Sequence, residues 1–481
     1  MNKQQRTKDE RQRTNPFFAL NYEPALESLG SEYSDLVEPA KFSQYILRFR
    51  NDNLLPILGL NSATVSDRHF LDFGGSFLGK QSRLALRYHG YQFGQYNPYL
   101  GDGRGFLYGQ IRGIDGQIYD FGTKGSGQTP YSQSRDGRLT LKSGVREVLV
   151  AEALHNLGVK TSRCLSLIET EAIARDGKKV RGAVMVRLSR SHLRFGTFER
   201  LEYYDRPDLI QQLLDHVIKY YYPHLWQRSD SYIRFYAELV RRIAQLVAQW
   251  MAVGFCHGVL NTDNMSIIGE SFDYGSCAFI DTYNPTFTAA SFDRQGRYSY
   301  RNQPSVCRWN LTMLQRPLAV AIPISEMEAA LESFPELYTR YYHQQMLQKL
   351  GFVRLSFLET EELIDLTLQF LFLTKVGYHQ FFSALRQKFT PQWRENPDSI
   401  LQDLEYLVSG EEVAILKRWC WFYHQLLLER SPEEIERIAQ YLQRANPIIV
   451  LSESEIDRIW NAIGEHNNWQ PFIDFSELIR G

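Results

Sequence analysis

The sequence predicts an α+β protein with a sheet-rich front part and a helical back part. Up to about residue 190 the chain is rich in glycine and in short alternating apolar runs. Beyond about residue 205, apolar residues recur three or four positions apart, which is helical spacing. With 481 residues, 43% of them hydrophobic, the chain is long enough for about two to four domains with buried cores.

In the front part, two strand-like runs at 106–111 and 117–123 flank a turn of Gly and Asp at 113–116, which predicts a β-hairpin. Apolar residues at helical spacing then predict a helix over 141–157. A later run at 180–188 places branched aliphatic side chains on one strand face, so Arg187 is expected to point to the opposite face.

In the back part, buried stripes predict helices around 209–221 and 239–250. Capping boxes begin at Ser431 and Ser452, each followed by isoleucines at helical spacing, and they predict further helices near the end of the chain. The expected organisation is a flexible tail over 1–14, a sheet-rich lobe over 15–190, a helical lobe over 191–340 and an added helical region over 341–481.

Composition excludes several classes of partner. The 54 Lys and Arg residues nearly balance 55 Asp and Glu residues, so no overall charge attracts nucleic acid or an acidic membrane. No apolar run approaches the about 18 residues of a membrane helix. Five scattered cysteines without a CxxC pair argue against disulfides and structural zinc. We therefore expect a cytoplasmic protein, most simply a monomer, that binds neither nucleic acid nor membrane.

Two features between residues 101 and 157 are typical of a nucleotide site. The turn Gly101-Asp102-Gly103-Arg104-Gly105 precedes a predicted strand, and glycines there let backbone amides approach phosphates. Lys124 ends the next strand, and Glu147 lies in the helix that follows. A strand lysine paired with a helix glutamate holds a cation on nucleotide phosphates. Taken singly, each feature is also compatible with a surface turn or a surface ion pair.

Two further features follow the predicted helix around 239–250. His257 and Asn264 keep the spacing of a protein-kinase catalytic loop, but Val259 occupies the position of the kinase base and cannot accept a proton. Asp273-Tyr274-Gly275 is similar to the metal-binding D-F-G motif. Asn264 and Asp273 offer hard oxygen ligands that suit Mg²⁺ or Mn²⁺. The order of the four features predicts a protein-kinase-like, two-lobed fold with a nucleotide site between the lobes.

Longer motifs resemble one family, selenoprotein O, also called YdiU or SelO. The resemblance covers residues from about 15 to 310, and its motifs are far longer than a generic kinase pattern. The matching segments are Gln92-Phe93-Gly94-Gln95-Tyr96-Asn97-Pro98, Leu100-Gly101-Asp102-Gly103-Arg104, Lys124-Gly125-Ser126-Gly127-Gln128-Thr129-Pro130-Tyr131-Ser132, Asp136-Gly137-Arg138, His257-Gly258-Val259-Leu260-Asn261-Thr262-Asp263-Asn264-Met265-Ser266 and Asp273-Tyr274-Gly275.

The resemblance implies a protein adenylyltransferase. ATP would bind flipped relative to a kinase, and AMP would pass to a Ser, Thr or Tyr hydroxyl of a protein while pyrophosphate leaves. Asp263 would be the general base, Asn264 and Asp273 would hold Mg²⁺ or Mn²⁺, and Glu147 would orient Lys124. The remaining nucleotide contacts implied are Gly101, Gly103, Arg104, Lys124, Asp136, Gly137, Asp273 and the phosphate clamp of Arg187 and Arg194.

Two alternatives stay open at this point. Asp263 could replace the missing base in a metal-dependent phosphotransferase, or the chain could be an inactive ATP-binding scaffold. The sequence also departs from the family pattern at its end, because the last cysteine is Cys420 and the C-terminal cysteine or selenocysteine motif is missing. Redox regulation through such a motif is therefore left open, as is the role of the terminal helices.

Overall fold

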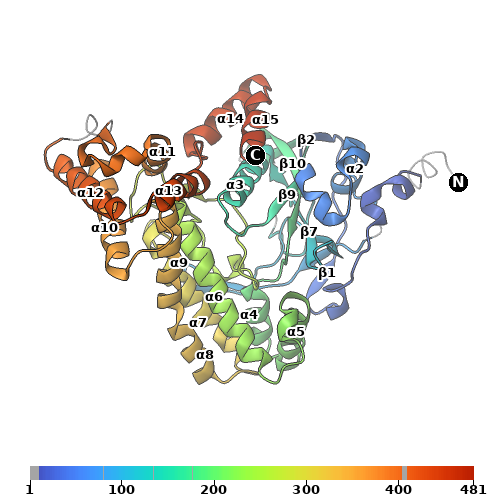
Figure 1. Ribbon diagram of the computed structural model, residues 1–481. Helices are drawn as coiled ribbons and strands as arrows, with labels where there is room; N and C mark the ends of the chain where they lie inside the picture. Colours follow the sequence, from blue (N-terminus) through green and yellow to red (C-terminus); the bar gives the residue numbers. More distant parts are fainter. Residues whose placement is uncertain (1–9, 80, 134, 176, 403–408, 481) are drawn as a thin grey trace.

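The structure is a computed structural model that describes residues 10–79, 81–133, 135–175, 177–402 and 409–480. A mixed α/β arrangement with a sheet-rich N-terminal part and a helical C-terminal part is confirmed (Figure 1). Residues 1–9 of the predicted tail lie outside the described residues. Residues 10–14 are helical, and Arg11 forms an ion pair with Asp72 at 2.9 Å, so this end of the predicted tail is docked on the protein.

The main sheet has the strand order β1-β3-β6-β7-β10-β9-β2, with β8 paired to β10, and its neighbouring strands run antiparallel. The predicted hairpin is β6 with β7, and the predicted run at 180–188 lies within β10. The strands are β1 Ser34–Leu36, β2 Ile46–Arg50, β3 Leu84–Leu86, β6 Leu107–Arg112, β7 Ile118–Lys124, β8 Leu139–Thr140, β9 Arg163–Arg175 and β10 Lys178–Ser189.

Both faces of the sheet are covered. Helix α3, Leu141–Asn156, lies within one residue of its predicted bounds and packs on one face with Met185, while α2, Asp67–Gly74, covers the other face with Val184 and Val186. Met185 is therefore a core residue, although the alternating pattern placed it opposite the apolar stripe with Arg187. A central strand covered on both faces needs apolar residues on both.

The helical part contains the predicted helices and more. Helix α5, Pro207–Tyr221, and α6, Ser231–Ala252, bury their predicted stripes. Two short strands, β11 Phe255–Cys256 and β12 Ala278–Phe279, pair and frame the loop that carries residues 257–273. The neighbouring helices are α4 Phe195–Tyr203, α7 Gln303–Leu318, α8 Ile324–Glu332 and α9 Phe334–Lys349.

The C-terminal region is not packed as a separate unit. Its side chains belong to the same hydrophobic cluster as α3 and α6, and Phe472 of α15 meets Phe49 of β2 with ring centres 6.0 Å apart. Helices α14 and α15, red in Figure 1, return to the sheet beside α3. The helices are α10 Phe357–Thr374, α11 Tyr378–Lys388, α12 Glu411–Leu428, α13 Pro432–Ala445, α14 Glu453–His466 and α15 Gln470–Leu478.

The predicted capping residues begin α13 and α14. Ser431 forms a full capping box with Glu434, whereas Ser452 accepts a hydrogen bond from the Glu455 amide. Among the described helices, none is long and apolar enough to cross a membrane.

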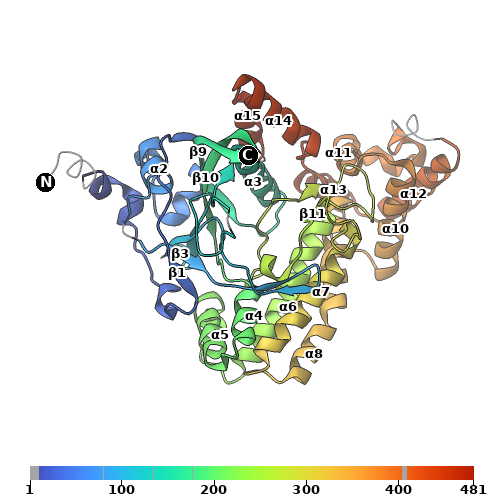
Figure 2. The ribbon, with the colours of Figure 1, turned by 180° about the vertical axis from the view of Figure 1, so that it is seen from behind.

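A small hairpin leaves the sheet and reaches the helical part. Strands β4, Gly90–Gln92, and β5, Gln95–Asn97, pair with each other and lie between β3 and the glycine turn along the chain. Figure 2 shows this hairpin extending toward α7, where the Tyr91 hydroxyl accepts a 2.8 Å hydrogen bond from Arg316. The hairpin therefore ties the two parts of the molecule together next to the candidate site.

Candidate active site

A cavity of about 770 Å³ lies between the sheet and the loop of residues 257–273. Every predicted site residue lines this cavity except Glu147, which lies behind it. The predicted residues in its wall are Gly101, Gly103, Arg104, Lys124, Asp136, Gly137, Arg187, Arg194, Asp263, Asn264 and Asp273. Residues that are far apart along the chain are thus brought into one pocket.

The glycine turn is shaped by close backbone approaches. A Cβ atom on Gly105 would lie 2.1 Å from the Thr123 carbonyl oxygen, and one on Gly101 would lie 2.3 Å from the Tyr131 ring. Only glycine fits such spacings without a shift of the neighbouring chain. The turn consequently lies flat against β7 and leaves the cavity open beside Lys124.

Lys124 sits at the end of β7 and is 4% exposed. Its Nζ donates to Glu147 of α3 and, at 2.9 Å, to Asp273. Burial lowers the pKa of Lys124, while the carboxylates of Asp273 and Glu147 favour its charged form. The predicted pairing of Lys124 with Glu147 is therefore present, and Asp273 offers Lys124 a second carboxylate.

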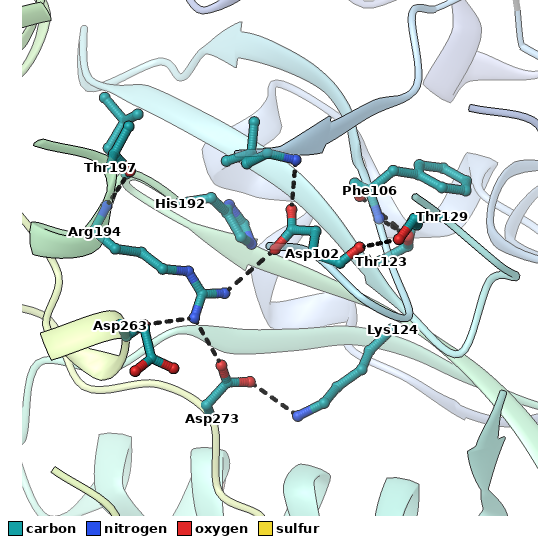
Figure 3. A network of polar contacts seen from close by, with 12 residues as sticks. Asp102, Phe106, Thr123, Lys124, Thr129, His192, Arg194, Thr197, Asp263 and Asp273 are labelled. Atoms are coloured by element: carbon teal, nitrogen blue, oxygen red, sulfur yellow. Dashed lines mark hydrogen bonds and ion pairs between the residues drawn. The ribbon is translucent and has the colours of Figure 1, made fainter. Parts of the chain in front are cut away.

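Asp273 is the point where three cations meet. Its carboxylate accepts from Lys124 and, at 3.2 Å, from Arg194 (Figure 3). It also accepts from Arg187 at 3.0 Å. Burial opposes its ionisation, but these three cations hold the pKa of Asp273 well below its usual range. Its backbone is left-handed, with a φ of 64°, which is uncommon for a residue other than glycine. Such strain is often found at functional positions.

Arg194 is held from several sides. Its guanidinium lies between the rings of Tyr88 and Phe272, at 4.5 and 4.8 Å from their centres. One nitrogen donates to the Asp263 carbonyl at 2.8 Å, and another lies 3.6 Å from the Asp102 carboxylate. Stacking and paired contacts suit a guanidinium and not an ammonium group. The side chain is thus fixed with its charge at the pocket wall.

Arg187 lies on the face of β10 opposite Val184 and Val186, as the alternation predicted, and it lines the cavity. The strand pairing with β9 shifts register between Val186 and Arg187. Arg187 is only 7% exposed, yet its Nε has no hydrogen-bond partner in the described structure. The Nε of Arg194, which is 4% exposed, also has no partner among the described residues. Buried, unpaired N–H donors beside a cavity suit an acceptor-rich ligand.

The loop residues sit opposite these cations. Asp263 and Asn264 belong to the short helix η7, Thr262–Asn264, and the Asn264 amide nitrogen donates to the Val259 carbonyl at 3.0 Å. This bond leaves the Asn264 oxygen as its available acceptor. Burial raises the pKa of Asp263 to about 6, and its Oδ1 has no partner within the described residues. A carboxylate whose pKa is close to neutral pH can accept a proton from a ligand.

The hairpin β4–β5 covers this loop from one side. The Thr262 hydroxyl accepts from the Tyr91 amide at 2.7 Å and donates to Glu199 at 2.7 Å. A Cβ atom on Gly90 would lie 2.8 Å from the Asp263 Oδ1. The hairpin therefore restricts where Asp263 can move.

The cavity carries an excess of positive charge, although the whole chain is nearly neutral. Seven cationic side chains and four carboxylates line it among the described residues. The cations are Arg104, Lys124, Arg135, Arg138, Arg175, Arg187 and Arg194, and the carboxylates are Asp102, Asp136, Asp263 and Asp273. This local cluster suits a polyanionic ligand.

Sequence reasoning missed several residues of this wall. Asp102 lies inside a quoted motif but had no assigned role, and Arg138 stands beside the predicted Asp136 and Gly137. Arg175 donates to Asp136 at 2.8 Å from the end of β9, and no local pattern singles it out. Tyr88 and Phe272, which enclose Arg194, read as ordinary apolar residues in the sequence.

The residues present fit a hard divalent cation. Asn264 and Asp273 present oxygen donors to the same cavity. No cluster of three or more His, Cys, Asp or Glu side chains suited to a metal is found in the described part of the chain. Mg²⁺ commonly binds to one or two carboxylates and completes its coordination with phosphate oxygens and water. A two-ligand site facing an anion pocket has that form.

Comparisons with known proteins agree in one direction. The family model described as protein adenylyltransferase SelO matches residues 16–480. A protein nucleotidyltransferase YdiU of Trichormus variabilis is 56% identical over 469 residues, which is 97% of each chain. One of Trichodesmium erythraeum is 55% identical over 477 residues, covering 97% of this chain and 99% of the relative. A more distant YdiU of Pseudomonas fluorescens is 38% identical over 368 residues, 76% and 75% of the two chains.

The fold, the cation-lined pocket and these matches define the class of protein as a nucleotidyltransferase. The match also runs to residue 480, well beyond residue 310, where the resembling motifs end. The chain belongs to the SelO family of protein adenylyltransferases.

Proposed function

We propose that this protein transfers AMP from ATP to Ser, Thr or Tyr hydroxyls of other proteins, in a two-lobed, protein-kinase-like fold. One observation carries the proposal. Lys124, Arg187 and Arg194 converge on the Asp273 carboxylate in the buried wall of a cavity that also exposes Asp263. A cluster of fixed cations at depth is suited to the most highly charged end of ATP, its terminal phosphates.

The proposed orientation of ATP is the one that the family resemblance implies. The terminal phosphates lie against the buried guanidinium groups of Arg187 and Arg194, and the α-phosphate faces the attacking hydroxyl. Gly101, Gly103, Arg104, Asp136 and Gly137 line the remaining wall and would contact the rest of the nucleotide. The flipped placement also accounts for Val259, because AMP transfer does not use the position of the kinase base.

The chemical step uses groups of this chain. The protein hydroxyl oxygen attacks the α-phosphorus, a new oxygen–phosphorus bond forms, and the bond to the pyrophosphate oxygen breaks. The hydroxyl proton passes to the carboxylate of Asp263, which lines the cavity. Asn264 and Asp273 would hold Mg²⁺ or Mn²⁺, which neutralises phosphate charge when bound. Lys124, oriented by Glu147, stabilises the leaving pyrophosphate.

Intact-mass spectrometry tests the proposal. The purified protein is incubated with ATP and Mg²⁺ or Mn²⁺, alone and with a mixture of candidate protein acceptors. We expect an AMP-sized increment on protein, which disappears in Lys124→Met and Asp273→Asn. A phosphate-sized increment would instead establish a phosphotransferase, and unchanged masses with retained ATP binding would establish a scaffold.

A further inference from the structure

We propose that the ion pair between Arg146 and Glu453 is a positioning device, through which the C-terminal helix α14 holds Lys124 and its two carboxylate partners in their active arrangement. The inference rests on the proposed function only in taking Lys124 as an ATP ligand. It assigns a role to the terminal helices, which the sequence left open.

Arg146 joins three segments that are distant in sequence. It lies in α3, and its Nη1 donates to the Glu453 Oε2 at 2.8 Å, while Nη2 donates to the other Glu453 oxygen. The same Nη2 donates to the Cys277 carbonyl. A bidentate guanidinium–carboxylate pair has a defined geometry as well as a charge attraction. The Arg146 and Glu453 side chains are 19% and 41% exposed, so solvent screens this pair only in part.

The position of Arg146 connects this pair to the nucleotide site. Its neighbour in α3 is Glu147, and Cys277 lies shortly after Asp273 in the chain. Glu147 and Asp273 are the two carboxylates that accept from Lys124. One guanidinium therefore anchors both backbone segments from which the partners of Lys124 project. A shift of α3 relative to the Asp273 loop would separate these partners.

Helix α14 is a firm anchor for that guanidinium. Arg181 of β10 donates to the Ile463 carbonyl and to the Asn467 side chain, both at 3.0 Å. The Arg48 guanidinium stacks over the Trp469 ring at 4.5 Å. These contacts fix the far end of α14 on the sheet, so Glu453 at its first turn presents its carboxylate to α3 from a fixed base.

The same two helices supply a matched control. Lys142 and Asp457 form a second pair one helical turn away, at 3.4 Å, with side chains 53% and 61% exposed. This pair also links α3 to α14, but the structure gives it no contact with the Asp273 segment. An exposed pair of this kind contributes little to stability.

The test compares Glu453→Gln, Arg146→Lys and Arg146→Ala with Asp457→Asn in the full-length protein. Binding of ATP is measured by calorimetry, kcat and KM for ATP by AMP transfer, and folding by thermal melting. We expect Glu453→Gln to raise the ATP dissociation constant and KM about fivefold to tenfold, with kcat less affected and the melting temperature equal to that of Asp457→Asn. Arg146→Lys should recover part of the affinity that Arg146→Ala loses.

Two results would overturn the inference. One is an ATP affinity of Glu453→Gln equal to that of Asp457→Asn, and the other is an affinity loss matched by an equal loss of melting temperature in every Arg146 and Glu453 variant. Failure of the proposed function would give a different experimental result. In that case the wild type transfers no AMP, while the calorimetric comparison of the variants still reports on positioning.

Discussion

At the scale of single residues, the site depends on charges that are fixed before a ligand arrives. Three cations share the Asp273 carboxylate, and the aromatic rings of Tyr88 and Phe272 hold the Arg194 plane. Preorganised charges of this kind stabilise a transition state without reorganising during the reaction. For Arg194, the planar shape of the guanidinium group therefore matters as much as its positive charge.

Arg194→Lys tests this point, because it keeps the charge and removes the planar fork. We expect ATP affinity to fall about tenfold or more, since an ammonium cannot fill the stacked position or reach Asp273 and the Asp263 carbonyl together. Arg190→Lys is the control, because Arg190 bonds to the Ile118 carbonyl and does not line the cavity. Equal affinities for the two variants, measured by calorimetry, would argue against a fixed guanidinium clamp.

Asp263→Asn separates catalysis from binding. Removal of a general base typically costs about 10²–10⁴ in rate, whereas ATP affinity should change little because no predicted phosphate contact is lost. The measurement is the rate of AMP incorporation beside calorimetric ATP binding. Full activity in Asp263→Asn would exclude Asp263 as the base.

At the scale of elements, the sequence predicted those parts whose pattern is local. The β6–β7 hairpin, α3, and the helices α5 and α6 follow from turn residues and periodic apolar stripes. The site motifs were visible because glycine spacing and short loop motifs are local too. The Arg146–Glu453 pair spans 307 positions, and Arg175 reaches Asp136 from another strand, so no local pattern could reveal them.

The glycine turn gives the element-scale prediction. Gly105→Ala places a methyl group 2.1 Å from the Thr123 carbonyl, next to Lys124, where backbone must move. We expect a loss of about 1–3 kcal/mol in the free energy of unfolding, and a strong loss of AMP transfer. Gly464→Ala in α14 is the control, since its Cβ would meet Trp460 at an ordinary 3.5 Å and helix propensity favours alanine. Denaturant titration compares the two, and similar stabilities would contradict the role given to Gly105.

At the scale of the whole molecule, one apolar cluster joins α3, the central helices and the C-terminal region. A buried lysine lies within it. The Nζ of Lys349 donates to the Asn446 side-chain oxygen at 3.0 Å and lies 4.2 Å from the centre of the Phe382 ring. An amide oxygen compensates a buried ammonium less well than a carboxylate does. Stability of the C-terminal region should therefore depend on pH through this group.

Burial lowers the pKa of Lys349 from 10.5 to about 7. Between pH 7 and 10.5 the unfolded chain binds more protons at Lys349 than the folded chain does. The free energy of unfolding therefore rises with pH across this window. Below pH 7, Lys349 makes the free energy of unfolding neither rise nor fall with pH. Lys349→Met should remove this rise and stabilise the protein by about 1–3 kcal/mol at pH 7. Urea titrations from pH 7 to 10 measure the slope, and an unchanged slope in the variant would exclude Lys349 as its source.

The central claim is that the α-phosphate of ATP, and not the γ-phosphate, faces the attacking hydroxyl. Parallel reactions with ATP labelled at the α- or at the γ-phosphorus, each with metal and a protein acceptor, test this claim most directly. We predict that the α-label stays on protein and that the γ-label leaves as pyrophosphate. Retention of the γ-label on protein, with the α-label in ADP, would contradict the account.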